Sequence, residues 1–418
     1  MSSAEAGETA PFDERSFSIF RYRPVTLLWF ARVASALAYQ MQAVAVGWQI
    51  YDLTSSPFQL GMVGMMMFIP GVLLVLVVGQ VADRFNRKRV ICIAQAVEAA
   101  AIAVLVVATL SGFVNTALIL SCVFMLGSGR AFESAIMQAL PTAVVPPVVL
   151  PRTIAGLSAA YQAATVLGPA VGGLLLVVGT VYVYAVCCAL IVLSSALIVM
   201  VRMTHAAPRR EPVTFESLFA GIHFVRKNPI VLGAMSLDMF AVIFGGATAL
   251  LPIFARDIFD VGTWGLGVMR AMPAIGALTV SFALSRWPVT KNLGRVMYAG
   301  VAMFGVSTVV FGLSTWFPLS LVALFGIGAS DMFGVVIRQP LVQLETPDAM
   351  RGRVSALNSL FIGTSNQIGE FESGVTAAWL GTVPAVVLGG LGTIVIVLLW
   401  IKAFPALYRV HSFQQRYK

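Results

Sequence analysis

Long apolar runs alternate with short polar breaks along almost the whole chain. A bilayer core requires about 20 mostly apolar residues per helix. Windows of about that length recur at residues 24–51, 58–79, 89–111, 114–138, 152–177, 180–202, 229–255, 264–285, 293–313, 316–341, 353–378 and 381–405. Turn-forming residues, such as Ser55–Pro57 and Asn115, separate them. The pattern predicts an all-α polytopic membrane protein with twelve transmembrane helices.

The composition supports a membrane protein and argues against several other classes. Of the 418 residues, 59% are hydrophobic and 11% are charged, whereas soluble proteins carry about 25% charged residues. The net charge of +9 resides in short loops between apolar runs, which favours membrane lipid as the partner and not nucleic acid. The histidines and cysteines form no metal-ligand or disulfide spacing. We therefore expect no metal, no cofactor and no enzymatic activity.

The distribution of cations predicts the orientation of the chain. Cationic loops at Arg84–Arg89, Arg152, Arg202–Lys227, Arg286–Arg295 and Arg351–Arg353 alternate with loops that are poor in cations. Because cytoplasmic loops carry the excess of lysine and arginine, both termini are expected in the cytosol. The predicted domains are a tail at 1–23, a six-helix bundle at 24–202, a linker at 203–228, a second bundle at 229–405 and a tail at 406–418.

The loop between the second and third predicted spans reads GQVADRFNRKRV at residues 79–90. It resembles the signature of the major facilitator superfamily at this position, and the matching residues are Gly79, Asp83, Arg84, Arg87, Lys88 and Arg89. The resemblance implies a gating role. Asp83 would bind the start of helix 11, near Arg353 and Ser355, where the helix dipole favours an anion. The equivalent loop of the second half, 285–296, has no aspartate.

Two further stretches, 51–64 and 343–374, are similar to the bacterial branch of this superfamily that includes the enterobactin exporter. This resemblance covers residues 20–405. It implies a monomeric, proton-coupled exporter, an antiporter of siderophores, drugs or metabolites, in the bacterial cytoplasmic (inner) membrane. An importer or facilitator of the same fold is the alternative. A polytopic membrane enzyme is disfavoured, because no histidine lies within a predicted span.

The fifth predicted span partly resembles a motif of drug/proton antiporters. Gly168, Pro169, Gly172 and Gly173 match it, while alanines replace its first two glycines. Small residues let helix backbones approach closely, and a proline removes a backbone donor. The stretch is interpreted either as a hinge that prevents leak or as ordinary close packing.

Charged residues inside the predicted spans are candidates for function, because each costs at least about 2.5–3.5 kcal/mol there. Proton coupling requires a carboxylate that exchanges between a buried and an arginine-paired state. The candidates are Glu133, Asp238 and Asp331, and a static ion pair is the alternative for each. Glu98 and Arg338 are expected near lipid or the cytosolic edge, in a static role.

A second set of polar residues could line a central substrate cavity. Arginines would suit an anionic small-molecule substrate, and amide and phenol groups would supply hydrogen bonds. The candidates are Arg32, Tyr39, Gln42, Arg130, Gln162, Arg270, Asn366 and Glu370. By depth, Arg270 and Glu370 could pair with one another.

Overall fold

The computed structural model describes residues 22–146, 149–201 and 215–413, and within them every regular element is a helix. The first half comprises α1 (Arg23–Thr54), α2 (Pro57–Leu73), α3 (Val75–Arg84), α4 (Arg87–Leu110), α5 (Thr116–Ala139), α6 (Pro141–Val144), α7 (Leu150–Leu176) and α8 (Thr180–Met200). The second half comprises α9 (Phe215–Lys227), α10 (Pro229–Phe244), η2 (Gly246–Leu250), α11 (Leu251–Ile253), η3 (Phe254–Ile258), α12 (Gly262–Arg286), α13 (Leu293–Leu313), α14 (Phe317–Leu344), α15 (Asp348–Leu380), α16 (Thr382–Ala403) and α17 (Pro405–Tyr408).

Each of the twelve predicted spans coincides with one of these helices or with a run of them. Nine helical segments of the described chain are long and apolar enough to cross a bilayer. The other three spans are α1, α15 and the α2–α3 pair. Helix α2 has only 17 residues because the helix breaks at Leu74, and α1 and α15 carry many polar side chains. The predicted all-α polytopic fold is confirmed.

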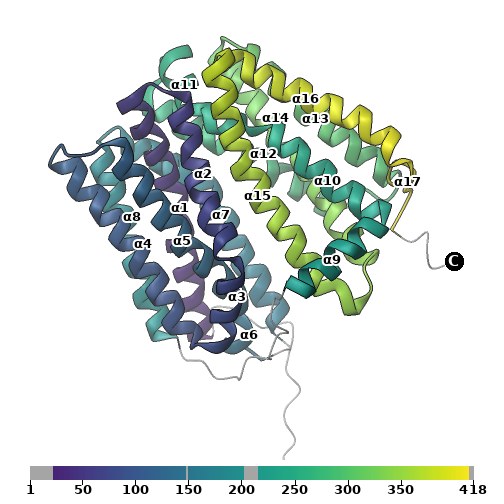
Figure 1. Cartoon of the computed structure of the whole chain (residues 1–418), viewed down its shortest axis with the longest axis horizontal. Coiled ribbons are helices and arrows are strands. Elements are labelled where there is room, and N and C mark those ends of the chain that lie inside the picture. Colours follow the sequence, from purple (N-terminus) through teal and green to yellow (C-terminus); the bar gives the residue numbers. More distant parts are fainter. Residues whose placement is uncertain (1–21, 147–148, 202–214, 414–418) are drawn as a thin grey trace, which may run out of the picture.

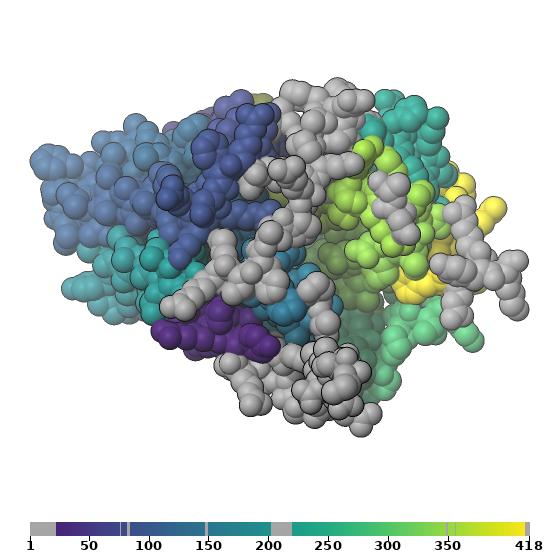
Figure 2. Space-filling model, turned by 90° about the horizontal axis from the view of Figure 1, so that it is seen from below, coloured from purple at the N-terminus to yellow at the C-terminus, as the bar shows by residue number. Residues whose placement is uncertain are grey.

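The helices of each half pack mainly on one another. In the first half α1 contacts α7 and α8, and α4 contacts α5 and α8; in the second half α13 contacts α14 and α16, and α12 contacts α14. Seen from below, the purple-to-blue half and the green-to-yellow half lie on opposite sides of the molecule (Figure 2). The helix pairs α2–α15 and α7–α12 join the halves. The exact domain boundaries remain a prediction.

The seventh predicted span is broken rather than continuous. Helix α10 ends at Phe244, and the chain then passes through a 3-10 turn, one short α-helical turn and a five-residue π-helix, Phe254–Ile258. Gly245 and Gly246 stand at the break, and a Cβ on Gly246 would lie 2.4 Å from the carbonyl oxygen of Gly369. Broken helices occur at membrane depth where they are buried in protein or line a cavity.

The halves touch closely at one end of the molecule, and glycines permit the contact. A Cβ at Gly374 in α15 would lie 2.5 Å from the Cα of Gly61 in α2, and one at Gly173 in α7 would lie 2.3 Å from the Cα of Gly267 in α12. Figure 1 shows α2 and α15 side by side in its upper part. We call this region the glycine seam. Gly173 thus packs closely against α12, and its predicted role in a hinge stays a prediction.

The same helices separate toward the other end, which carries the basic loops around Arg84–Arg89 and Arg351–Arg353. A Cβ at Gly71 in α2, or at Gly363 in α15, would have no described atom within 4 Å, apart from its chain neighbours and the nearby backbone of its own helix. Because α2 and α15 run in opposite directions, these two positions mark the stretch beyond the seam. Helices α2 and α15 are thus in backbone contact at the seam and face open space at Gly71 and Gly363, toward the basic end.

Polar contacts between the halves reinforce the closed end. The Arg256 guanidinium in η3 donates a 3.1 Å hydrogen bond to the carbonyl oxygen of Tyr51 and lies 3.8 Å from the Asp52 carboxylate. The Tyr51 hydroxyl donates to Asp257, and Arg256 also lies over the Tyr51 ring. We call Tyr51, Asp52, Arg256 and Asp257 the outer latch, because the charge pattern predicts that this end faces away from the cytosol.

Two cations of the 79–90 loop bind helix ends within the first half. Arg87 donates a 3.3 Å hydrogen bond to the carbonyl oxygen of Ala139 at the end of α5, and Lys88 donates a 3.1 Å bond to that of Val201. Unpaired carbonyl groups at helix C-termini favour such cations. The side chain of Asp83 lies outside the described part of the structure, so its predicted contact with α15 stays a prediction.

Candidate functional site

A cavity lies between the halves, next to the glycine seam on the side of the basic end. The cavity and the open solvent space at its mouth together take up about 590 Å³. Helices α1, α2 and α5 supply an apolar wall, and α12, α15 and η2 supply the opposite side. The lining residues are Tyr39, Gln42, Ala43, Val46, Gly47, Leu60, Val63, Met67, Val123, Leu126, Ala249, Arg270 and Glu370.

Four of the lining side chains are polar: Tyr39, Gln42, Arg270 and Glu370. Among the described residues, none of the four makes a side-chain hydrogen bond to another protein group, and the buried Nε atom of Arg270 is without a partner. Arg270 and Glu370 also do not approach within the 4 Å of an ion pair. Their suggested direct pairing is therefore absent. Buried polar groups are normally satisfied, so this set is open to a ligand.

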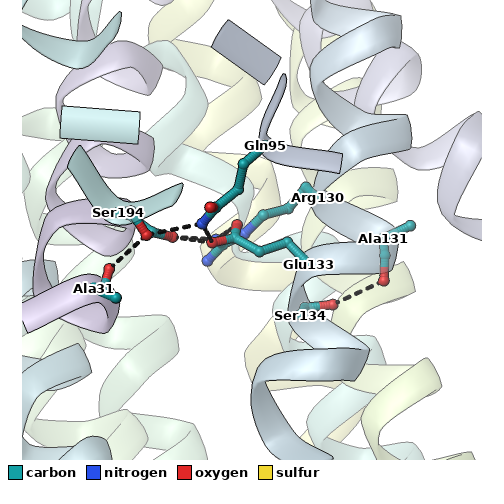
Figure 3. Close-up of polar contacts among 8 residues, drawn as sticks. Ala31, Gln95, Arg130, Ala131, Glu133, Ser134 and Ser194 are labelled. Carbon is teal, nitrogen blue, oxygen red and sulfur yellow. Dashed lines mark hydrogen bonds and ion pairs between the residues drawn. The ribbon is translucent and has the colours of Figure 1, made fainter. Parts of the chain in front are cut away.

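A cluster of buried polar side chains lies within the first half, beside this cavity. Figure 3 shows its contacts. Glu133 is fully buried, and Arg130, one helical turn earlier in α5, approaches its carboxylate to 2.6 Å. The Gln95 amide donates a 3.1 Å hydrogen bond to the same carboxylate and a 2.8 Å bond to Ser194. The Ser35 hydroxyl also donates to Glu133. Thus α1, α4 and α5 bind this one acid directly, and α8 acts on it only through Gln95.

A second carboxylate, Glu98, lies in the same cluster without a counter-charge of its own. It is one turn after Gln95 in α4 and is 5% exposed, and one of its oxygens has no hydrogen-bond partner. Its Cγ would be 2.6 Å from a Cβ on Gly129, the neighbour of Arg130. The expectation of a lipid-facing or edge position for Glu98 was therefore wrong. Gln95 and Glu98 share a helix face, which the sequence spacing could have indicated.

Tyr39 connects the cavity to this cluster. Its ring lines the cavity, and the Arg130 guanidinium lies over the ring, 4.4 Å from the centroid. Arg32, one to two turns earlier in α1, lies over the ring of Tyr161 in the same way, at 4.8 Å. Cations over aromatic faces are attracted by the ring quadrupole. A solute that moves Tyr39 would therefore disturb the Arg130–Glu133 pair directly.

The second half contains a related cluster. Arg338 in α14 forms a hydrogen-bonded ion pair with Asp238 in α10, and both side chains are largely buried. Asp331 lies two turns before Arg338 on the same helix, and the described residues give it no hydrogen-bond partner. Arg338 is buried and so does not face lipid, whereas its place six residues before the end of α14 fits the other expectation, a position near the edge. Each half thus pairs one arginine with one of two carboxylates.

Four of the eight predicted cavity residues lie elsewhere. Tyr39, Gln42, Arg270 and Glu370 line the cavity, whereas Arg130 and Arg32 lie behind it on aromatic rings. Gln162 and Asn366 are exposed and lie outside this lining, and the Asn366 amide donates to the carbonyl of Ile362 in its own helix.

The remaining glycines of the α7 motif lie against α1. A Cβ at Gly168 would lie 2.5 Å from the Cβ of Gln40, and one at Gly172 would lie 3.0 Å from the Cα of Met41. Pro169 stands between them inside the helix. Together with Gly173, these residues let α7 approach both α1 and α12, so any movement of α7 changes contacts in both halves.

The fold and the buried charges define a polytopic membrane transporter of the major facilitator type. The family model described as "Transmembrane secretion effector" matches residues 10–413. The chain therefore belongs to the transmembrane secretion effector family of the major facilitator superfamily. This makes the protein a transporter and not an enzyme, and the resemblance inferred from residues 79–90 is confirmed.

Characterised relatives are distant. The chain is 25% identical over 400 residues to the enterobactin exporter EntS of Escherichia coli O1:K1 / APEC. The alignment covers 91% of this chain and 92% of the relative. The same figures hold for the enterobactin exporter of Shigella boydii serotype 18.

Solved structures share the fold at low identity. The nucleoside transporter NupG (D323A mutant) aligns with a TM-score of 0.71 at 13% identity, covering 91% of this chain and 100% of that chain. A POT family transporter in complex with a thioalcohol-conjugated peptide aligns with a TM-score of 0.72 at 10% identity, and the alignment covers 92% of this chain and 96% of that chain. These similarities establish the fold alone.

Proposed function

We propose that this protein is a proton-coupled exporter, an antiporter that works by alternating access on a small amphipathic or anionic solute such as a siderophore, drug or metabolite. It would reside in the bacterial inner membrane with both termini in the cytosol. The bacterial relatives named as enterobactin exporters support export. The cationic loops support the orientation.

The observation that carries this proposal is the link from the cavity through Tyr39 to the Arg130–Glu133 pair. A carboxylate that pairs with an arginine in one state and loses it in another would release and load a proton. In the described structure Glu133 is paired and surrounded by donors. A solute seated against Tyr39 would hold Arg130 on Glu133 and keep the acid deprotonated. After the solute leaves on the external side the pair would loosen and Glu133 would take a proton, so that solute and proton bind alternately, as antiport requires.

The charge count of the second cluster also supports proton coupling. Asp238 and Asp331 share Arg338 as their nearest counter-charge. Two buried carboxylates with one arginine leave one negative charge, which is costly in a water-poor interior. One proton would remove that charge. In the first cluster Arg32 and Arg130 together balance Glu98 and Glu133. Glu133, Asp238 and Asp331 remain the proposed coupling residues, and Glu98 joins them.

The arrangement of the halves supports alternating access. With the proposed orientation, the glycine seam and the outer latch close the external side, while the cavity communicates with the cytosolic side. In the exporter cycle the solute would enter from the cytosol, and the halves would then part at the seam. The basic motif, with Asp83 against α15, would close the cytosolic side of that outward-open state.

Everted membrane vesicles energised by respiration test the proposal. A pH-gradient dye reports whether an added solute drives protons out of the vesicles, and radiolabelled solute reports its uptake. The panel would contain enterobactin, a lipophilic cation and aryl acids. Glu133→Gln should abolish solute-driven proton flux, whereas the control Glu372→Gln, outside both the cavity and the clusters, should retain it. Solute uptake that is equal with and without the gradient would overturn the proposal and favour a facilitator.

A further inference from the structure

The cavity between the halves contains two opposite charges that are not paired with each other. Arg270 comes from α12 and Glu370 from α15, and both line the same cavity. No ion pair joins them, and the described residues supply neither with a hydrogen-bond partner. A charged group in such surroundings costs several kcal/mol unless a partner compensates it. The missing partner can be a ligand.

The two charges are held apart by packing. The Oε2 and Cβ atoms of Glu370 lie 3.0 Å and 2.8 Å from the position of a Cβ on Gly64, so the side chain fills the notch that this glycine leaves in α2. The Arg270 Nη2 atom lies 3.4 Å from the corresponding position on Gly47 in α1. Each charge is thus seated against a different helix of the first half.

The rest of the lining is divided between the halves. All the charge comes from α12 and α15, whereas α1, α2 and α5 contribute a wall of Val46, Leu60, Val63, Met67, Val123 and Leu126. Gln42 adds an amide beside this wall. A ligand that fits would present its charged groups to the second half and an apolar body to the first. Methionine and aliphatic side chains accommodate apolar bodies of varied shape.

We infer that the cavity binds an amphipathic zwitterion, a small solute with an anionic group for Arg270, a cationic group for Glu370 and an apolar body for the first half. A purely anionic solute would satisfy Arg270 but would lie beside the Glu370 carboxylate. A purely cationic solute would satisfy Glu370 but would lie beside the Arg270 guanidinium. This inference rests on the proposed transport function and narrows its substrate class.

Matched probes separate these classes. 4-Phenylbutanoate, 3-phenylpropylamine and 2-amino-4-phenylbutanoate share one phenylpropyl body and differ in charge, and naphthyl versions extend the series. Affinities would be measured by calorimetry with the full chain in lipid nanodiscs. Because a hydrogen bond to a charged group contributes about 1.5–3 kcal/mol, the zwitterion should bind about tenfold or more tightly than either single-charge probe.

Variants assign each charge to its partner. Glu370→Gln should remove the preference for the zwitterion over the anion, and Arg270→Gln should remove the preference over the cation. Glu372→Gln should change neither preference. If a glutamine variant fails to fold, Glu370→Asp and Arg270→Lys should retain the order of affinities with reduced differences.

Two outcomes would overturn the inference: the anion binds the unaltered protein as tightly as the zwitterion, or no probe of either series binds. The proposed function fails differently. Zwitterion selectivity in nanodiscs with transport indifferent to the pH gradient would leave the ligand class intact and remove proton coupling. Gradient-driven transport of a purely anionic solute would leave proton coupling intact and remove the zwitterion as the ligand class.

Discussion

The glycine seam makes the closed state of the outer end sensitive to a single methyl group. In Gly374→Ala the new Cβ would lie 2.5 Å from the Cα and 2.8 Å from the backbone nitrogen of Gly61, and 2.9 Å from the carbonyl oxygen of Pro57. All three neighbours are backbone atoms, so none can rotate away. The halves must therefore shift apart at this point.

The cost of that shift can be estimated from overpacked cores. Inserting a methyl group into close-packed structure costs typically about 1–3 kcal/mol. If the strain is present only while the seam is closed, it changes the ratio of closed to parted outer ends by about 5- to 150-fold. Gly374→Ala should therefore increase the population in which the outer end is open and the basic end is closed.

Controls on the same two helices isolate the effect of the seam. Gly71→Ala and Gly363→Ala add the same methyl group where no described atom lies within 4 Å. An alanine in a helix interior is favoured over glycine by up to about 1 kcal/mol, so these variants should fold at least as well as the parent.

Spin-label distances provide the measurement. One label pair at the exposed Phe113 and Trp316 spans the outer end, and another at the exposed Phe85 and Trp287 spans the basic end. Gly374→Ala should lengthen the first distance and shorten the second, while Gly71→Ala should leave both unchanged. Identical distance distributions in Gly374→Ala and Gly71→Ala would refute the assignment of the seam as the closed gate.

Three further predictions concern single charged side chains. Asp238→Asn should lower the free energy of unfolding by up to about 3–5 kcal/mol, because it removes the hydrogen-bonded counter-charge of the buried Arg338 and leaves only Asp331, two turns away. The added change Arg338→Met should restore part of the loss, and equal stability of the single and double variants would contradict this. Arg256→Gln removes the outer latch and should lengthen the Phe113–Trp316 label distance, and an unchanged distance would show that the latch does not hold this end. Asp83→Asn should weaken the outward-open state while leaving insertion and folding intact, which transport rates and accessibility of the cytosolic cavity would check.

The helices could be predicted from the sequence because their main cause is local. Each span is an apolar run long enough for a bilayer, and its ends carry turn residues or caps. The Asn115 side chain, for example, accepts a hydrogen bond from the backbone of Leu118 where α5 begins. Predicted and observed bounds therefore differ by only a few residues. The break after Phe244 was missed, although Gly245, Gly246 and the following Pro252 were a signal for it.

The partners of the buried charges could not be predicted in the same way. Asp238 and Arg338 are 100 residues apart in sequence, and nothing in the local pattern of either helix identifies the other. Arg130 and Glu133 were predictable as a pair because they are three residues apart on one helix. The cavity depends on how two bundles meet, so the sequence indicated polar candidates but not which of them face one another.

Proton flux in energised everted vesicles tests the central claim most directly. A solute that the protein carries should drive protons out of vesicles containing the unaltered chain and the Glu372→Gln control. Vesicles containing Glu133→Gln should show no such flux, because the acid that Arg130 holds is replaced by a neutral amide. Equal proton flux in Glu133→Gln and in the unaltered protein would contradict the coupling of the cavity to the Arg130–Glu133 pair.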